Sequence, residues 1–597
     1  MTEPTLNLGE AASEADWRAL VEQGLKGAQW ARLVGKTADG IALEPLYRET
    51  DIATARDISG MPGAAPFVRG GRADAWAIRQ AFEHPDPEQT NQEVLADLAG
   101  GVSAIELVVG ARGVAIDSAA HLDVALANVI LEAAPVSLDA AGDALRAANL
   151  LRNKLKGVAA PGTAFNLDPL GVRLRGATLD ASACFAFAVS AGSELPHAHA
   201  LRADARLVHE AGGSEAQEIA YALHAGISYL RGLTDAGLTA EQAAATIAFA
   251  LSIGPDVLIE TAKLRALRLC WARVLEASGA PPAARAAYVH AFSSRRMMTR
   301  HDAWTNILRV TTSAFAAAIG GADAITTYPL TDALGLPTPF ARRVARNTQM
   351  VLLEECRLGH VADPAGGAWF VEKLTRELAD RAWSIMQQLE ATPDAGASLA
   401  QLVAEMRTQR QRAIATRRET ITGVTDFPLL DETTPEFIAR TTQSEDSPFA
   451  PVRWAEPFET LRAKAAKAAP RVFFANMASL AEFGPRAQWS RNLLAAGGVD
   501  SIGPEDAHAT MEALVDAFRA SRARVALIAS TDACYTEHAE NAAQRLKAAG
   551  ATWVVLAGKP GDNETRWRAA GVDQFIFAGV DALKELETLH AALGVGA

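Results

Sequence analysis

The stretch Arg471-Val-Phe-Phe-Ala-Asn476 is a short apolar run, and a helix-like segment follows it. Buried parallel strands have nearly continuous apolar sequences of this kind. The same alternation continues to the end of the chain, with further strand candidates at residues 499–502, 524–529, 552–557 and 574–577. Five strand–helix units over residues 470–597 predict a small doubly wound, flavodoxin-like domain, whose ligand site would lie at the carboxyl ends of the strands.

A second, longer α/β pattern lies between residues 75 and 390. We interpret its shorter apolar runs as strands, at residues 103–109, 135–138 and 184–189. We interpret its longer patterns as helices, at residues 216–232, 240–252 and 256–277. Strand–helix alternation indicates a parallel α/β unit, and a closed barrel of eight such units typically takes ~250 residues or more. The sequence therefore predicts a (β/α)8 TIM barrel over residues 51–395.

Two further segments complete the predicted organisation. Residues 1–50 form an N-terminal arm with a short helix, because apolar residues recur at i, i+3, i+4 and i+8, namely Trp17, Leu20, Val21 and Leu25. The apolar stripe of this helix needs a surface to cover, either on the chain's own body or on another subunit. Residues 396–469 are first helical and charge-rich and then rich in proline, which predicts a helix followed by an extended linker.

The composition limits the classes of function. Among 597 residues, 57 Lys and Arg stand against 70 Asp and Glu, a net charge of −13, which disfavours a protein that coats nucleic acid, although a local basic patch could persist. Four scattered cysteines predict neither a disulfide framework nor a cysteine-built zinc site and fit a reducing compartment. No uncharged stretch reaches the ~18 apolar residues of a bilayer span, and residues 1–10 lack the features of a signal peptide. We expect a soluble, cytoplasmic protein without nucleic-acid or membrane partners.

Two motifs partly match known ligand-binding patterns, one for phosphate and one for a metal, but each lacks a residue that the pattern requires. The loop Ala557-Gly558-Lys559-Pro560-Gly561 has Pro560 where a phosphate-binding loop needs Ser or Thr, which favours a plain strand-to-helix loop. The stretch Pro196-His197-Ala198-His199, with Asp204 and His209 nearby, could imitate a metal cluster, but no second tight ligand pair accompanies it. Histidines in a loop or a subunit contact are the favoured interpretation.

Two other segments could either meet a ligand or pack within the chain. Gly366-Gly367, followed by Trp369 and Phe370, indicates a tight backbone approach, for which packing is favoured over a ligand loop. Residues 342–347 form a basic helical face, interpreted as solvated surface, with an anionic ligand or an acidic partner as alternatives. Taken alone, the residues indicate a large α/β barrel and a small doubly wound domain, without a nucleophile–base pair, a metal set or a nucleotide loop.

Several longer motifs are specific when they are taken together, in order and at their spacing. They are Glu210-Ala211-Gly212 with residues 218–221, residues 260–268 with Trp271, residues 345–349, and residues 363–367 with Val371-Glu372. In this set the chain resembles the adenosylcobalamin-dependent acyl-CoA mutases, above all the methylmalonyl-CoA mutases, over roughly residues 50–597. The resemblance implies a barrel that holds acyl-CoA along its axis and a C-terminal flavodoxin-like domain that carries cobalamin.

The chain departs from that family at the residues that carry its chemistry. The family's cobalamin domain has Asp-x-His-x-x-Gly, in which the His ligates cobalt and the Asp orients it, and the aligned residues here are Leu480, Glu482 and Pro485. The catalytic Tyr of the Ile-Arg-Gln-Tyr motif falls on Ala81, and the catalytic His, three residues before Glu-Ala-Gly, falls on Leu207. His209 is close in sequence but aligns with a glutamine position. The resemblance therefore implies a vestigial cobalamin-binding-type domain and no catalytic, cofactor-binding or metal-binding residue in this chain.

Some mutases of this family pair a catalytic large subunit with a paralogous small subunit that kept the fold and lost the site. The resemblance implies that this chain is such a small, non-catalytic subunit, with residues 1–50 as a subunit contact. The heterodimer would interconvert (R)-methylmalonyl-CoA and succinyl-CoA by a radical mechanism, with adenosylcobalamin and the acyl-CoA substrate both on the large subunit. Two alternatives stay open: an active acyl-CoA mutase with atypical cobalamin ligation, and a free-standing regulatory protein that binds acyl-CoA.

Overall fold

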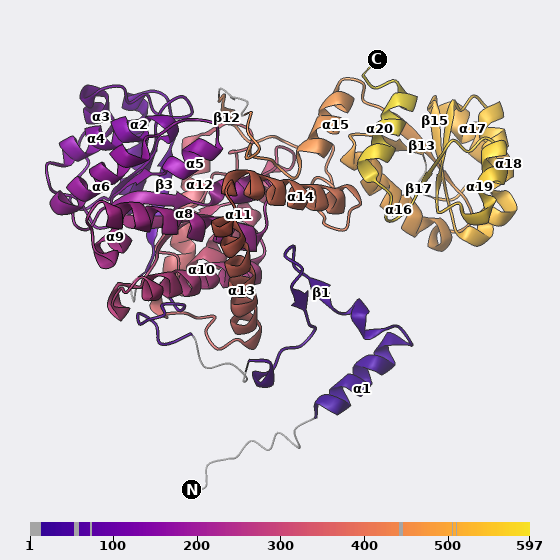
Figure 1. Cartoon of the computed structure of the whole chain (residues 1–597). Coiled ribbons are helices and arrows are strands. Elements are labelled where there is room, and N and C mark those ends of the chain that lie inside the picture. The colour runs from indigo at the N-terminus through magenta and orange to yellow at the C-terminus, as the bar shows by residue number, and fades with distance from the viewer. Residues whose placement is uncertain are drawn as a thin grey trace, which may run out of the picture.

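The computed structural model describes residues 13–52, 59–71, 75–440, 446–503, 506–508 and 510–596, and a large barrel and a smaller sheet domain are separately visible in it (Figure 1). Residues 1–10, for which the sequence predicts no signal peptide, lie outside the described residues. Within the described ranges, no helix is both long enough and apolar enough to cross a bilayer.

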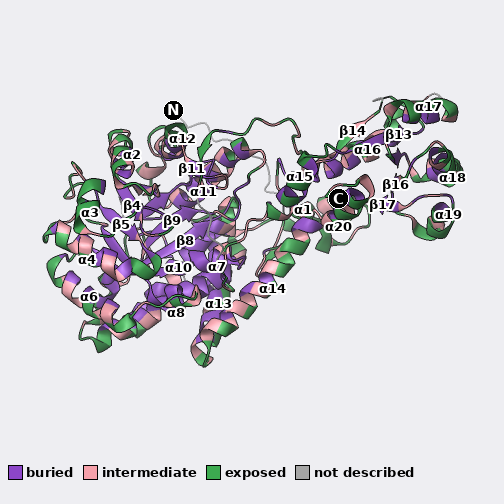
Figure 2. Cartoon of the chain, turned by 90° about the horizontal axis from the view of Figure 1, so that it is seen from above, coloured by how far each residue is buried: buried purple, intermediate pink, exposed green. Residues whose placement is uncertain are grey.

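Eight described strands, each parallel to its neighbours, close into a barrel in the order β10-β3-β4-β5-β6-β7-β8-β9. They are β3 (Ala77–Phe82), β4 (Ala104–Val108), β5 (Val136–Asp139), β6 (Ala164–Leu167), β7 (His199–Asp204), β8 (Ile247–Ile253), β9 (Tyr288–Ser293) and β10 (Ala324–Thr326). These strands form the buried centre of the larger unit (Figure 2). The predicted TIM barrel is confirmed, and so are the strands predicted at residues 103–109 and 135–138.

Helices surround the barrel strands. They are α2 (Pro87–Ala99), α3 (Ala119–Ala125), α4 (Ala144–Leu155), α5 (Pro169–Leu174), α6 (Ala181–Glu194), α7 (Arg206–Glu210), α8 (Glu215–Asp235), α9 (Ala240–Thr246), α10 (Val257–Ala277), α11 (Asn306–Ile319) and α12 (Pro339–Met350). The long helix α8 begins at a capping box of Ser214 and Gln217, and α10 begins where the Asp256 side chain accepts the N–H of Ile259. The helices predicted at residues 216–232 and 256–277 are confirmed.

Two predictions within the barrel are wrong. Residues 184–189, predicted as a strand, lie in α6, because the Asp180 side chain caps two N–H groups of the first turn and the helix then buries one face. Residues 240–252, predicted as one helix, divide into α9 and β8, and every residue of β8 is buried. A continuous apolar run has no periodicity that distinguishes a buried helix from a buried strand.

In the C-terminal domain, five described parallel strands form a sheet in the order β14-β13-β15-β16-β17. They are β13 (Arg471–Asn476), β14 (Asp500–Ile502), β15 (Val525–Ala529), β16 (Trp553–Ala557) and β17 (Gln574–Ile576). Separate apolar cores lie under α16 (Leu480–Ala496) with α20 (Ala582–Leu593), and under α17 (Met511–Ser521), α18 (Asp532–Ala548) and α19 (Glu564–Ala569). This strand order and double covering confirm the flavodoxin-like prediction.

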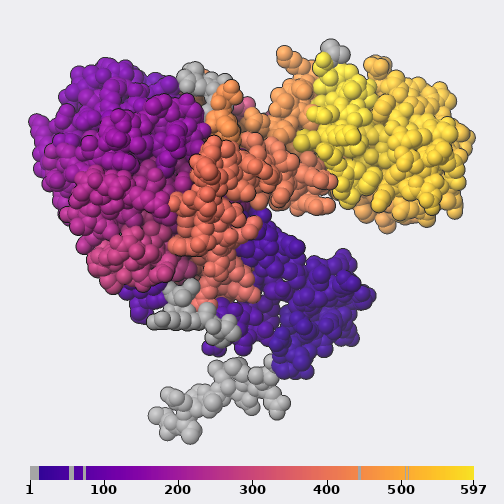
Figure 3. All heavy atoms as spheres, in the orientation of Figure 1, coloured from indigo at the N-terminus to yellow at the C-terminus, as the bar shows by residue number. Residues whose placement is uncertain are grey.

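Three helices and an extended segment join the two units (Figures 1 and 3). Helix α13 (Trp369–Ala391) packs along α8 and α10, and α14 (Ala395–Ala415) leads from the barrel toward the C-terminal domain. In the extended segment, β12 (Phe437–Ile438) pairs with β11 (Leu336–Pro337), and α15 (Glu456–Ala466) follows. Ile414, Val424 and Phe458 belong to a core of the C-terminal domain, so this segment is packed into the fold at its far end.

The N-terminal segment contacts the barrel and α13 at several residues, including Tyr47, whose ring packs on Phe370 with centroids 4.8 Å apart, while its helix α1 stands clear. In α1 (Glu14–Leu25) every residue is at least partly exposed, and Leu20 is 68% exposed. The hairpin of β1 (Gly35–Lys36) and β2 (Ala42–Leu43) brings Asp39 to the start of α8, where its carboxylate accepts the N–H of Ala216 at 3.0 Å and the hydroxyl of Ser214. Trp17 packs edge-on against Trp30, with ring centroids 5.7 Å apart, whereas the part of the apolar side that carries Leu20 is not covered by the described part of this chain (Figure 1).

A buried ammonium group ties α8, α10 and β8 together. Lys263 Nζ lies 2.8 Å from Glu218 Oε2 and 2.5 Å from Glu260 Oε2, and it also donates to the carbonyl oxygen of Ser252. The other oxygen of Glu218 accepts the N–H of Ser252 at 2.7 Å. Ions this deeply buried persist only when their partners are in place.

Replacing Lys263 with Met should therefore lower the free energy of unfolding of the barrel by about 3–5 kcal/mol, because Glu218 and Glu260 lose their counter-ion. Urea unfolding monitored by circular dichroism measures this loss. The matched control is Lys154→Met, because Lys154 pairs at 2.6 Å with the exposed Asp123 and its loss should cost less than about 1 kcal/mol. Equal losses in the two variants would contradict a structural role for the buried cluster.

Candidate functional site

The two positions that align with the family's catalytic side chains carry aliphatic residues. Ala81 lies in β3, and Leu207 lies fully buried in α7. Neither side chain can transfer a proton or hold a hydrogen bond. The nearby His209 is buried elsewhere, with Nε2 2.8 Å from Ser294 Oγ and Nδ1 3.2 Å from Glu218 Oε2. Burial and the neighbouring Arg296 hold the pKa of His209 well below its usual value, so it stays a neutral structural residue.

Charged side chains from opposite walls of the barrel meet on its axis. The Arg202 guanidinium of β7 lies 3.1 Å from Glu106 of β4, 3.2 Å from Asp139 of β5 and 3.1 Å from Asp204. Strands β4 and β7 are separated by β5 and β6, so Arg202 and Glu106 reach one another only through the interior. Arg206 completes the group, 2.9 Å from Asp139 and 2.5 Å from Asp204. We call these five residues the axis cluster.

A second layer of polar side chains crosses the barrel beside the axis cluster. Arg79 of β3 lies 3.4 Å from Nδ1 of His290 on β9, and its other nitrogen donates to the carbonyl of Gly162 at 2.8 Å. His290 Nε2 lies 2.8 Å from the hydroxyl of Thr326 on β10. Burial and Arg79 hold the pKa of His290 well below its usual value, so the ring is neutral. Together the two layers place buried polar side chains from six strands, β3, β4, β5, β7, β9 and β10, in the barrel interior.

Ion pairs also close the mouth of the barrel beside Ala81. Arg295 lies 3.1 Å from Asp332, and Arg440 from the linker lies 2.5 Å from Glu83 and 3.4 Å from Asp332. The cavity that Ala81 lines here measures about 20 Å³. A pocket for a ligand of drug size takes about 300–1,000 Å³. The Ala81 side chain therefore faces room for about one water molecule.

Two carboxylates of the axis cluster, Asp204 and Asp139, are held in their charged form, whereas burial raises the pKa of Glu106. Burial disfavours the charge of Asp204, but Arg206 and Arg202 outweigh it and hold its pKa well below the usual 3.8. The same balance lowers the pKa of Asp139, on which Arg206 is the leading opposing influence. The sequence does carry a signal for this cluster, because charged residues occur within apolar strand sequences. Glu106 lies in one such sequence, and Arg202, Asp204 and Arg206 occupy alternate positions in another region. The sequence analysis did not identify this signal.

Because the folded-state pKa of Asp204 lies below 3.8, its charge stabilises the fold above that pH, and the contribution is lost as the pH falls below it. Asp204→Asn should lower the free energy of unfolding by about 3 kcal/mol at pH 6. The variant should then lose less stability than the wild type between pH 5 and pH 3, measured by urea unfolding at each pH. Asp516→Asn, at an exposed carboxylate, is the control and should follow the wild type. Parallel curves for all three proteins would refute the argument.

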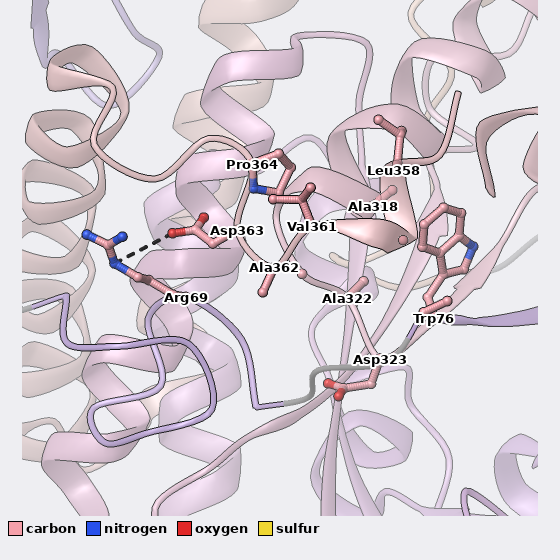
Figure 4. Close-up of a pocket in the computed structure, with 13 residues that line it drawn as sticks. Arg69, Trp76, Ala318, Ala322, Asp323, Leu358, Val361, Ala362, Asp363 and Pro364 are labelled. Carbon is pink, nitrogen blue, oxygen red and sulfur yellow. Dashed lines mark ion pairs between the residues drawn. The ribbon is translucent and has the colours of Figure 1, made fainter. Parts of the chain in front are cut away.

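A second cavity, of about 50 Å³, lies at the other end of the barrel strands (Figure 4). Arg69, Trp76, Asp323 and Asp363 are among the residues that line it. Its carboxylates are already engaged, because Asp363 pairs with Arg265 and Asp323 accepts the N–H of Val289 at 2.8 Å. The volume admits one or two water molecules rather than a substrate.

The glycine pair predicted to bring backbones close lies beside this second cavity. A Cβ on Gly366 would lie 2.4 Å from Asp363 Oδ2, so only glycine fits there. Gly367 has a φ of +81°, and its N–H donates to Glu372 Oε1 at 3.0 Å. Glu372 in turn lies 2.6 Å from Arg265. The pair therefore supports a buried ion-pair network, in line with the packing interpretation.

The other sequence candidates are not brought together into a site. His199 stacks on Tyr288 with ring centroids 4.2 Å apart, Asp204 belongs to the axis cluster and His209 contacts Ser294. Within the described ranges, no group of three or more His, Cys, Asp or Glu side chains is arranged to hold a metal. The loop after β16 lies against the C-terminal core, where a Cβ on Gly558 would meet Tyr535 at 2.9 Å.

The interpretation of residues 342–347 as a solvated basic face is wrong for Arg342 and Arg346, although Arg343 is exposed. Arg342 is buried, 2.5 Å from Glu93 and 3.3 Å from Asp97 of α2, and Arg346 lies 2.7 Å from Asp97. The acidic partner of this face belongs to the same chain. Side-chain pairing between distant helices leaves no trace in the local spacing of charges.

At the C-terminal domain, the segment that would carry the cobalt ligand is the start of a helix. Ser479 caps α16, and Glu482 reaches back to the Ser479 N–H at 3.0 Å, so Glu482 serves as part of a capping box. Leu480 is exposed and Pro485 lies inside α16. Helical backbone and the absence of any imidazole at these aligned positions do not fit a cobalt ligand.

The crevice at the carboxyl ends of β13 and β15 is filled by the chain's own side chains. The Tyr535 hydroxyl accepts the N–H of Ser530 at 2.8 Å and donates to the carbonyl of Ala557 at 2.8 Å. Ser530 Oγ donates to the carbonyl of Met477 at 2.9 Å, and Arg486 lies over the Tyr535 ring. This edge is the place where doubly wound domains bind ligands, and here its residues do not fit a cobalamin.

The motif residues that carry the resemblance make buried structural contacts. Glu210 accepts the N–H groups of Arg295 and Arg296 at 3.1 and 2.7 Å. Trp271 packs against Phe249 with ring centroids 4.9 Å apart, and Gln349 accepts the Trp76 indole N–H at 3.0 Å. Together with Lys263 and Arg265, these residues hold the barrel and its helices in place.

Comparison with known proteins agrees with this picture. The family described as Methylmalonyl-CoA mutase matches residues 36–524. A protein of Streptomyces virginiae named methylmalonyl-CoA mutase small subunit is 40% identical over 98% of this chain and 97% of its own length. One of the same name from Propionibacterium freudenreichii subsp. shermanii is 34% identical over 100% of this chain and 97% of its own length. A protein of Cereibacter sphaeroides named methylmalonyl-CoA mutase is 31% identical over 70% of this chain and 64% of its own length. With fold, motifs and comparisons in agreement, this chain belongs to the methylmalonyl-CoA mutase family of generally cobalamin-dependent isomerases.

Proposed function

We propose that this chain is the small, non-catalytic subunit of a heterodimeric methylmalonyl-CoA mutase. Its partner is a large subunit that holds adenosylcobalamin and acyl-CoA and interconverts (R)-methylmalonyl-CoA and succinyl-CoA. The observation that carries the proposal is the axis cluster, in which Arg202 pairs across the barrel with Glu106. The names of the relatives from Streptomyces virginiae and Propionibacterium freudenreichii support it.

An acyl-CoA could enter this barrel only by separating the axis cluster. Moving Arg202 away would leave Glu106, Asp139 and Asp204 without one of their counter-ions. Breaking a buried pair from one side costs about 3–5 kcal/mol. The free energy of binding an acyl-CoA at micromolar affinity is only about −8 kcal/mol, so displacing several such pairs leaves little net affinity.

The chain also offers no group that could take part in the reaction. Bound adenosylcobalamin supplies the radical by homolysis of its cobalt–carbon bond, and that chemistry belongs to the cofactor. Ala81 and Leu207 have no acid or base to place beside a substrate, and Leu480, Glu482 and Pro485 are a helix start. The role left to the chain is to pack against the large subunit and stabilise it. The uncovered part of the apolar side of α1, at Leu20, supports a contact of the N-terminal arm with that partner.

Titration of adenosylcobalamin into the purified chain and into the reconstituted heterodimer tests the proposal. The isolated chain should show no saturable spectral change, whereas the heterodimer should bind one cofactor and turn over methylmalonyl-CoA. A histidine-on cobalt spectrum or turnover from the isolated chain would instead favour an active mutase with atypical ligation. Failure to associate with a large mutase subunit, together with tight binding of an acyl-CoA, would favour a free-standing regulatory protein.

A further inference from the structure

A large apolar surface lies where the linker crosses the starts of α11 and α12. Among the described residues, seven large apolar side chains are 41–70% exposed in this region. They come from three segments that are distant in sequence, and we call them the linker patch: Trp304, Leu308, Phe340, Phe427, Leu429, Phe437 and Ile438.

Three contacts place the starts of α11 and α12 and residues 433–438 of the linker side by side. The rings of Trp304 and Phe340 have centroids 6.4 Å apart, and Leu308 follows Trp304 by about one helical turn. Phe437 pairs with Pro337 in the β11–β12 ladder, directly before α12. The Trp304 indole N–H donates to the carbonyl of Thr433 at 2.8 Å, which fixes the middle of the linker on this surface.

The linker patch is held rigidly in its exposed form. Glu432 binds the ring of His301 and the N–H of Asp302, and Arg462 donates to the carbonyl of Leu429 at 2.7 Å. These contacts anchor the backbone between the exposed apolar side chains. A surface that is already ordered loses little conformational entropy when a partner covers it.

The backbone at Phe427 has a strained, left-handed conformation, and in this conformation the ring is exposed to solvent. Phe427 has a φ of +52° and is 70% exposed. A bulky residue in the left-handed region costs of order 1–3 kcal/mol and persists where the surrounding structure imposes it, often at binding sites. The turn is imposed here by Asp426, which pairs with Arg417 at 3.1 Å. Within the described chain, this strain gains no burial for the ring.

The size of the linker patch matches one side of a stable interface. With aromatic side chains of about 150–250 Å² each, the exposed parts of the seven residues amount to about 700 Å². The largest apolar patch of an ordinary monomer covers about 300–600 Å². A standard protein–protein interface buries about 800 Å² on each partner.

We propose that the linker patch is the docking surface for the large mutase subunit, in addition to the N-terminal arm. This inference rests on the proposed function, because the partner is the large subunit named there. The area and rigidity of the patch indicate a permanent protein partner with a matching apolar face rather than a small ligand. Phe427 and Phe437 are the expected anchors, since buried aromatic side chains dominate interface energies.

The test is the affinity of this chain for the large mutase subunit of the same organism, measured by isothermal titration. The double variant Phe427→Ser, Phe437→Ser should weaken binding at least thirty-fold, which corresponds to about 2 kcal/mol. The matched control is Ile130→Ser, Val158→Ser, which removes two exposed apolar side chains elsewhere on the barrel and should change affinity less than threefold. Hydrogen exchange of residues 427–438 in the wild-type complex gives a second readout, and these amides should slow on binding.

The outcomes separate the two proposals. If the wild-type chain does not bind the large subunit at all, the proposed function fails and the patch proposal fails with it. If the wild type binds but the double variant binds equally well, or residues 427–438 gain no protection, only the patch proposal is overturned. If the double variant instead abolishes a homodimer of this chain and leaves the heterodimer intact, a second copy is the occupant and the patch proposal is again overturned. Exchange in the wild-type complex decides the question even if the double variant does not fold.

Discussion

The structure depends on one constraint: a guanidinium placed inside a closed barrel must have carboxylates around it. Arg202 meets this constraint with Glu106, Asp139 and Asp204, which come from three strands of the barrel wall. Pairing of this kind neutralises the buried charges within the chain, because an ion that is paired with side chains needs neither a ligand nor water to stabilise its charge. The same pairing places side chains from β4, β5 and β7 in the interior of the barrel. Under the proposed function, these side chains occupy the space that a long ligand would need.

Several residues that carry the family resemblance hold the scaffold together. Lys263, Arg265 and Glu210 bind other parts of the scaffold, and their loss would leave buried partners uncompensated. Ala81 and Leu207, which the family resemblance aligns with reaction positions, carry no polar group. Under the proposed function, the chain has the scaffold residues and lacks the reaction residues. Exposed apolar side chains are present at Leu20 of α1 and on the linker patch.

Much of this could be predicted from the sequence, and the failures have physical causes. The strands of the C-terminal domain were predictable to within one residue, because each apolar run is bounded by polar turns. Residues 240–252 were mistaken because full burial of β8 erases periodicity, and residues 184–189 were mistaken because their uninterrupted apolar run carries no helical pattern although α6 buries only one face. Arg342 was mistaken for surface because its partners, Glu93 and Asp97, lie some 250 positions away in sequence. The axis cluster was not predicted for the same reason, since its paired residues are far apart in sequence. Ala81 and Leu207 were singled out only through the family resemblance, since an alanine or a leucine carries no local signal of function.

The central claim is that the axis of this barrel is occupied by side chains and holds no acyl-CoA. The most direct measurement is the stoichiometry of acyl-CoA binding to the purified heterodimer, by equilibrium dialysis with labelled succinyl-CoA. The account predicts one acyl-CoA per heterodimer and none on the isolated chain at millimolar ligand. Two acyl-CoA molecules per heterodimer, or saturable binding to the isolated chain that places the ligand between Arg202 and Glu106, would contradict it.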